Sequence, residues 1–140
     1  MHHFACLIGY GASAVNAYVA IDSIREAVGS DRFGETTVEM ALSNFRKAIE
    51  NGLLKVMAKM GISTISSYRG AQTFEAIGIG PEVIHRCFLG TTSHVGGITL
   101  HQVGVDAIRR HQAAYGTEEI RALDVGGNYR VAKGGRGEYH

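Results

Sequence analysis

Apolar side chains recur at steps of three and four over much of the chain, which is the spacing of one face of an amphipathic helix. Three stretches show this spacing, at residues 15–28, 38–49 and 100–114. The most regular stripe consists of Val38, Ala41, Leu42, Phe45 and Ile49. The pattern predicts a mainly helical protein whose periodicity is lost after Gly116.

Residues suited to helix ends divide the helical part further. Thr36 with Glu39 and Thr99 with Gln102 each form a capping box, in which two residues satisfy each other's backbone N–H groups. Ser13 is a candidate cap for the first helix, which would then run to Val28.

Two further boundaries follow from glycine and proline. Asn51-Gly52 predicts an end or a bend, because both residues tolerate the left-handed conformation at a helix C-terminus. A third helix is expected from Ser63 or Thr64 through Tyr68 and Phe74 to Gly78. Pro81 after Gly80 predicts a short fourth helix, since proline suits the first helical turn.

One segment departs from the helical pattern. Residues 4–8, Phe-Ala-Cys-Leu-Ile, form a continuous apolar run before Gly9, which is typical of a strand buried on both faces. A single strand leaves its backbone donors and acceptors unpaired, so it would have to join a sheet formed elsewhere. We therefore predict an α/β fold: a mainly helical fragment with an N-terminal buried strand, part of a larger α/β domain.

The composition is that of an ordinary globular domain. Apolar residues make up 45% of the 140 residues and charged residues 19%, which favours a packed core over disorder. The formal net charge of +1 indicates neither a nucleic-acid partner nor an acidic membrane surface. Cys6 and Cys87 are far apart and fit no metal or redox pattern, and no secretory leader follows Met1. These features predict a cytosolic protein with no metal site in this segment.

The segment from Gly9 to Ala14, Gly-Tyr-Gly-Ala-Ser-Ala, matches the G-x-G-x-x-A pattern of dinucleotide-binding turns. After a strand and before a helix, its glycines would let a phosphate approach the helix N-terminus. The second strand and acidic residue that such a site needs are not found about 20 residues further on. A stand-alone nucleotide- or phosphate-binding module is thus an alternative function, and a helical interaction subunit is another.

Two adjoining stretches resemble a signature of glutamate synthases: residues 52–64, GLLKVMAKMGIST, and residues 66–78, SSYRGAQTFEAIG. The resemblance extends upstream through residues 2–12 and downstream to residues 96–98 and 137–140. It covers nearly the whole chain in the right order. The chain thus resembles the C-terminal part of the central domain of the glutamate synthase large subunit, where it leads to the FMN domain.

The resemblance implies a flavoprotein oxidoreductase of nitrogen assimilation, which makes two L-glutamates from L-glutamine and 2-oxoglutarate. The full-length family enzyme holds FMN and an iron–sulfur cluster. Its electrons come from an NAD(P)H-oxidising small subunit or from ferredoxin, in the cytoplasm or, in a plant or alga, the plastid. No catalytic or cofactor-binding residue of the family can be carried over to this segment.

The resemblance also implies a division of labour along the chain. Residues 1–115 would belong to the central domain, and residues 116–140 would be a glycine-rich linker toward the FMN-binding domain. The segment would be a scaffold between the glutaminase and FMN centres, inactive alone, and able to self-associate through surfaces that other domains normally cover. The expected domain interface consists of Lys59, Ser63, Thr64, Tyr68, Arg69 and Gln72.

Overall fold

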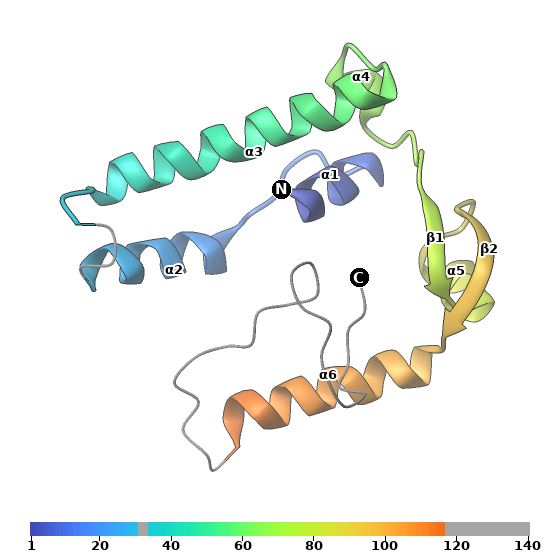
Figure 1. Cartoon of the computed structure of the whole chain (residues 1–140). Helices are drawn as coiled ribbons and strands as arrows, with labels where there is room; N and C mark the ends of the chain where they lie inside the picture. The colour runs from blue at the N-terminus through green and yellow to red at the C-terminus, as the bar shows by residue number, and fades with distance from the viewer. Residues whose placement is uncertain (31–33, 117–140) are drawn as a thin grey trace. The chain divides into compact units, whose positions relative to one another are not determined.

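A computed structural model describes residues 1–30 and 34–116 (Figure 1). The chain divides into two compact units, Met1–Thr73 and Phe74–His140. The first unit holds helices α1 (His2–Gly9), α2 (Tyr18–Gly29), α3 (Val38–Met60) and α4 (Ile65–Tyr68). The second holds β1 (Glu75–Ile79), α5 (Pro81–Cys87), β2 (Thr92–Ile98) and α6 (Leu100–Tyr115). The predicted class is confirmed: the chain is mainly helical and contains a small parallel sheet.

In the first unit, α1 and α2 both pack against the long helix α3 (Figure 1). Phe4 of α1 meets Phe45 of α3 edge to face, with ring centroids 6.4 Å apart, a favourable aromatic geometry. A Cβ atom at Gly52 would overlap the side chain of Met1, so the missing side chain lets the N-terminus approach α3. The buried apolar side chains of this unit are Ala5, Met57 and Tyr68.

The N-terminal strand predicted over residues 4–8 is wrong, because these residues lie inside α1. A run of five apolar residues fits a buried strand or one face of a short helix equally well. The helix needs no partner strand, since its backbone groups bond within it. Ala5 faces the core at 3% exposure, whereas Leu7 is 47% exposed.

Helix α3 starts one residue later than predicted and runs further. Its N-cap is Thr37, whose hydroxyl accepts from the backbone N–H of Met40 at 3.3 Å, and not Thr36. The predicted end or bend at Asn51-Gly52 is also wrong, because the helix continues to Met60. It stops at Gly61, whose φ of +72° suits glycine, with the N–H of Ile62 bonded to the carbonyl of Met57 at 2.9 Å.

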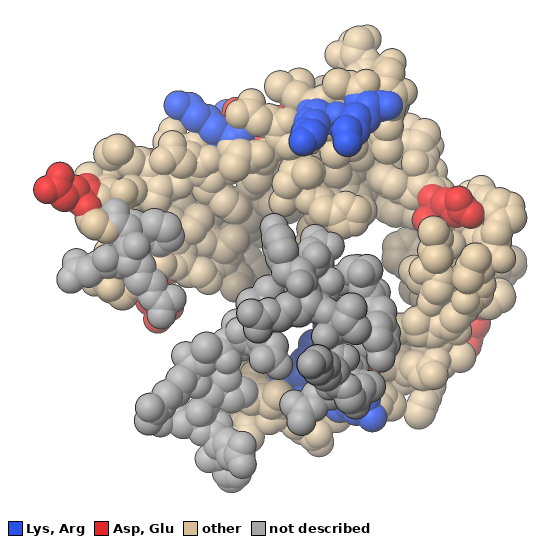
Figure 2. All heavy atoms as spheres, in the orientation of Figure 1, with Lys and Arg blue, Asp and Glu red and all other residues tan. Residues whose placement is uncertain are grey.

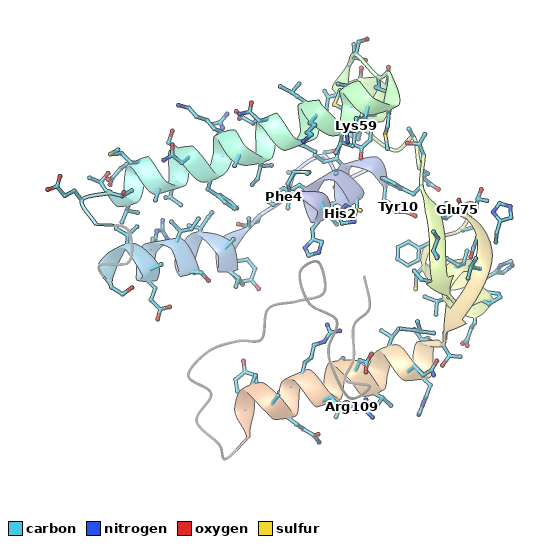
Figure 3. The ribbon with its side chains drawn as sticks, in the orientation of Figure 1. His2, Phe4, Tyr10, Lys59, Glu75 and Arg109 are labelled. Atoms are coloured by element: carbon cyan, nitrogen blue, oxygen red, sulfur yellow. The ribbon has the colours of Figure 1, made fainter. Side chains whose placement is uncertain are left out.

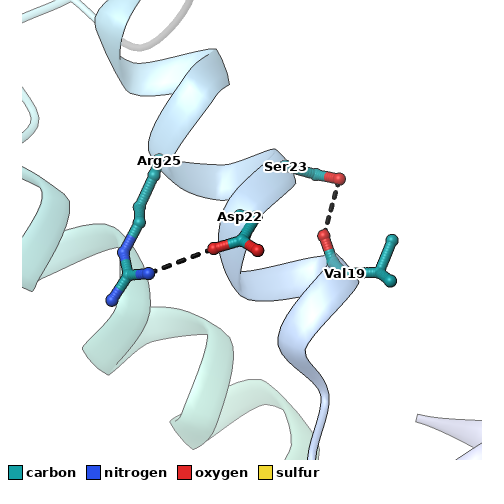
Figure 4. A network of polar contacts seen from close by, with 4 residues as sticks. All are labelled: Val19, Asp22, Ser23 and Arg25. Atoms are coloured by element: carbon teal, nitrogen blue, oxygen red, sulfur yellow. Dashed lines mark hydrogen bonds and ion pairs between the residues drawn. The ribbon is translucent and has the colours of Figure 1, made fainter.

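The first predicted helix starts later than expected. Helix α2 begins at Tyr18, so the prediction that Ser13 caps it is wrong. The Ser13 hydroxyl accepts a bond from Arg69 instead. The exposed face of α2 carries a local ion pair between Arg25 and Asp22 at 3.1 Å, close to a bond from the Ser23 hydroxyl to the Val19 carbonyl (Figure 4).

In the second unit, β1 and β2 pair in parallel and α5 connects them. The helix predicted up to Gly78 is therefore wrong: α4 ends at Tyr68, and residues 75–79 form β1. The start of α5 at Pro81 is confirmed, and α5 buries Val83 and Ile84. Across the strands, Glu75 Oε1 lies 2.7 Å from His94 Nδ1.

The capping box at the start of α6 is confirmed. The Thr99 hydroxyl accepts from the backbone N–H of Gln102 at 3.3 Å, and the Gln102 side chain accepts from the N–H of Thr99 at 2.8 Å. No residue of α6 is buried. The predicted glycine-rich linker over residues 116–140 lies outside the described residues from 117 onward.

Candidate functional site

Three of the predicted interface residues, Tyr68, Arg69 and Gln72, lie where the end of α4 meets α1. We name this contact the α1–α4 junction. It consists of Tyr68 to Gln72 on one side and Ala5, Ile8, Gly9 and Ser13 on the other. Tyr68 is at its centre and is fully buried. Its hydroxyl donates to the carbonyl oxygen of Ala5 at 2.8 Å. A buried phenol needs such a partner, because an unsatisfied buried hydroxyl is costly. Tyr68 therefore lies inside the unit, and not on its surface.

The residues that follow Tyr68 bond to the end of α1. The backbone N–H groups of Gly70 and Gln72 donate to the carbonyls of Ile8 and Gly9, both at 3.1 Å. The last carbonyl groups of a helix have no partner within the helix. These two bonds therefore provide hydrogen-bond donors for carbonyl groups at the C-terminal end of α1. Tyr68 and the two backbone bonds together hold segments more than 60 positions apart in the sequence.

Gln72 adopts this position in a conformation that favours glycine. Its φ is +51°, and among the described residues it is the non-glycine residue with a positive φ. We expect Gln72→Gly to raise the free energy of unfolding by up to about 1 kcal/mol, because glycine adopts this region without steric cost. Urea unfolding followed by circular dichroism measures the change. Gln72→Val should destabilise, since a β-branched residue at positive φ is strained further; a stable Gln72→Val chain would contradict this account.

The polar side chains beside the junction make mostly local bonds. Arg69 donates from its guanidinium to the Ser13 hydroxyl at 3.0 Å. Thr64, the N-cap residue of α4, has its hydroxyl 2.8 Å from that of Ser67. Both Arg69 and Thr64 are exposed. These contacts bring Arg69 into the junction, whereas Thr64 bonds within the α4 turn.

The other predicted residues are exposed. Lys59, labelled in Figure 3, is in the last turn of α3 and is exposed. Ser63 lines an open depression at the end of α3, with Leu54, Met57, Ala58, Gly61 and Ile62. Basic side chains gather over α3, which carries Arg46, Lys47, Lys55 and Lys59 (Figure 2). The predicted set thus divides into a buried centre, Tyr68, and five exposed residues around it.

Burial raises the pKa of two side chains at the junction, Cys6 and Tyr68. Burial raises the pKa of the Cys6 thiol on α1. Burial, and then the charge of a Cys6 thiolate, raise the pKa of the Tyr68 hydroxyl above its ordinary value of about 10. Cys6, Ala5 and Ser13 were not among the predicted interface residues. Ala5 and Ser13 bond to residues that lie 63 and 56 positions away, so no local pattern reveals these contacts.

The raised pKa of Tyr68 predicts a loss of stability in alkali. Below about pH 10 the phenol is protonated in both states, so its contribution is fully present. As pH rises further, the unfolded chain loses this proton first, and stability falls through the higher pKa of the folded state. The stability difference between the natural chain and Tyr68→Phe should therefore be constant below about pH 10 and shrink as the pH rises above it, as measured by urea unfolding. A difference that stays constant as the pH rises further would contradict the prediction.

The described residues, 1–30 and 34–116, contain no group of three or more His, Cys, Asp or Glu side chains placed to hold a metal ion. Within the same ranges, no helix is long and apolar enough to cross a membrane.

The described residues form a mainly helical fold with a small parallel sheet, and the stretch 66–78 that resembles glutamate synthases begins at the α1–α4 junction. The family model that describes the glutamate synthase central domain matches residues 1–80. The chain is 46% identical over 140 residues to the glutamate synthase [NADPH] large chain of Bacillus subtilis (strain 168), covering 100% of this chain and 9% of that protein.

Two further relatives are also glutamate synthases. The chain is 46% identical over 134 residues to the glutamate synthase [NADPH] large chain of Azospirillum brasilense, covering 96% of this chain and 9% of the relative. It is 40% identical over 148 aligned positions to the ferredoxin-dependent glutamate synthase of Pyropia yezoensis, covering 99% of this chain and 10% of that protein. The chain belongs to the glutamate synthase central domain family. It spans about a tenth of the length of these curated relatives.

Proposed function

We propose that this chain is a structural segment of a glutamate synthase large chain, which makes two L-glutamates from L-glutamine and 2-oxoglutarate with a reductant. The observation that carries the proposal is the 46% identity to a glutamate synthase large chain over the whole of this chain, within a relative about ten times longer. The proposal assigns the oxidoreductase activity to the complete large chain and none to this segment alone.

Within that large chain, residues 1–115 would be the C-terminal part of the central domain, and residues 116–140 a linker toward the FMN-binding domain. The family match over residues 1–80 supports the first part of this division. A scaffolding role is supported by Tyr68, Gly70 and Gln72, whose hydrogen bonds hold the C-terminal half of α1. Lys59, Ser63, Thr64, Arg69 and Gln72 are exposed around that centre and remain the proposed interface with neighbouring domains.

FMN and the iron–sulfur cluster of the complete enzyme would be held by its FMN-binding domain, as the resemblance to the family implies. The relatives include proteins named as NADPH-, NADH- and ferredoxin-dependent. An NAD(P)H-oxidising subunit or reduced ferredoxin is accordingly the proposed electron donor. The proposed location is the cytoplasm, or the plastid in a plant or alga.

Two measurements on the natural gene product test the proposal. Its intact mass should correspond to a chain of many hundreds of residues, and the purified protein should form glutamate from glutamine and 2-oxoglutarate only when reductant is supplied. The 140-residue chain alone should form none. A natural product of 140 residues that works without partner chains, or a long product without this activity, would overturn the proposal.

The alternative of a nucleotide-binding module loses its structural basis. Gly9 is the last residue of helix α1, and the next helix starts only at Tyr18. A phosphate-binding turn of the dinucleotide type needs a strand before it and a helix N-terminus directly after it.

A further inference from the structure

The parallel pair β1 and β2 is less covered than parallel strands normally are. Parallel sheets are generally buried on both faces, and two strands alone are marginally stable in water. In the described part of the second unit, α5 buries Val83 and Ile84, but no residue of β1 or β2 is buried. Ile77 is 71% exposed, and its cross-strand partner Val95 is 53% exposed.

Neither strand carries the side chains that most often protect a free edge. Natural edge strands are commonly guarded by lysine or proline, which discourage pairing with further strands. The sequences of β1, EAIGI, and β2, TSHVGGI, contain neither residue. Glu75 is the acidic residue of the pair, and it is engaged with His94. An edge of this kind favours the addition of another strand.

The two edges differ in regularity. The register pairs Glu75 with Thr92, Ile77 with Val95 and Ile79 with Ile98. Over this ladder, β2 advances by three residues for every two residues of β1. These irregularities lie in β2, and bulges make an edge less suitable for pairing. The edge of β1 that faces away from β2 is therefore the better template.

We propose that the free edge of β1 binds an extended strand from another part of the same large chain, whose apolar side chains cover Ile77. This inference rests on the proposed function, since it requires the large chain. The length of the relatives supports this occupant: about nine-tenths of each lies outside the region that matches this chain, so one polypeptide can supply the strand. Main-chain bonds would supply the affinity, and apolar contact with the exposed Ile77 side chain would supply the specificity, as in β-strand addition generally.

Hydrogen exchange on the complete large chain tests the inference. In a two-stranded ladder, alternate amides of β1 point away from β2 and exchange quickly. With a further strand bound, every amide from Ala76 to Ile79 should exchange at least about 100-fold more slowly than in an unstructured peptide. Fast exchange at alternate amides would overturn the inference. Protection that weakens on dilution would also overturn it, because it would identify a second copy as the occupant.

A pair of matched variants in the same large chain adds a second readout. Leu89, in the turn after α5, is 72% exposed, close to the 71% of Ile77. Ile77→Lys should abolish the protection of residues 76–79, whereas Leu89→Lys should leave it unchanged. Equal behaviour of the two variants would contradict strand addition at β1. Glutamate formation by the unmodified large chain is measured in parallel: activity without protection refutes this inference alone, whereas protection without activity refutes the proposed function alone.

Discussion

Replacing Tyr68 by alanine is expected to destabilise the unit Met1–Thr73 by about 3–5 kcal/mol, the usual cost of deleting a buried aromatic ring. Tyr68 is the fully buried large side chain of the described residues, and its hydroxyl is bonded to Ala5. The variant therefore loses the ring packing and the link to α1 together. Urea unfolding of the chain, followed by circular dichroism at the helical band, measures the loss.

Two controls separate the contributions of Tyr68. Tyr68→Phe keeps the ring and removes one hydrogen bond, so it should cost about 1 kcal/mol. Tyr18→Ala deletes a tyrosine that is 63% exposed and should change stability by less than about 0.5 kcal/mol. If Tyr68→Ala cost no more than Tyr18→Ala, the junction would not hold the unit together.

Replacing Gly97 by alanine is expected to open the pairing of β1 and β2. A Cβ atom at Gly97 would overlap the carbonyl oxygen of Gly78, a backbone atom that cannot rotate away. Gly78 itself has a φ of +77°, so neither position accepts a side chain readily. Overpacking of this kind typically costs about 1–3 kcal/mol and sometimes more. Hydrogen exchange of the β1 and β2 amides should show a correspondingly lower opening free energy.

The neighbouring glycine provides the matched control for Gly97. A Cβ atom at Gly96 would meet the Pro81 ring at 3.9 Å, an ordinary van der Waals contact. Gly96→Ala should therefore change the opening free energy by less than about 0.5 kcal/mol. Equal losses for Gly96→Ala and Gly97→Ala would show that strand flexibility, and not the close approach to Gly78, determines the pairing.

The features that sequence predicted well are those decided by neighbours in the chain. The apolar stripe from Val38 to Ile49 predicted the first half of α3, because a helix aligns residues three and four apart. Pro81 and the Thr99–Gln102 box located the starts of α5 and α6. Each of these signals acts within one or two helical turns, so no knowledge of the tertiary structure is needed to read it.

The strands illustrate what local patterns cannot supply. The residues of β2 that pair with β1 lie 17 or more positions further along the chain. The five residues of β1 also include Gly78, and glycine is unusual in a strand interior. The apolar run at residues 4–8 fitted a strand or a helix, and it forms α1, in which Ala5 is buried and Phe4 packs on Phe45 of α3. The same holds for the site: Tyr68 was identified by resemblance, but its partner Ala5 could be found only from the fold.

The continuous course of α3 sets a rule for which changes in length the first unit can accept. Its 23 residues form one rod that contacts α1 through Phe45 and ends at the turn before α4. One inserted residue would advance everything beyond it by about 1.5 Å and rotate it by about 100°. Phe45 and Met57 could then no longer face the same core. Insertions in homologous chains should accordingly be confined to loops, or come in about seven residues, which restores the rotation after two turns.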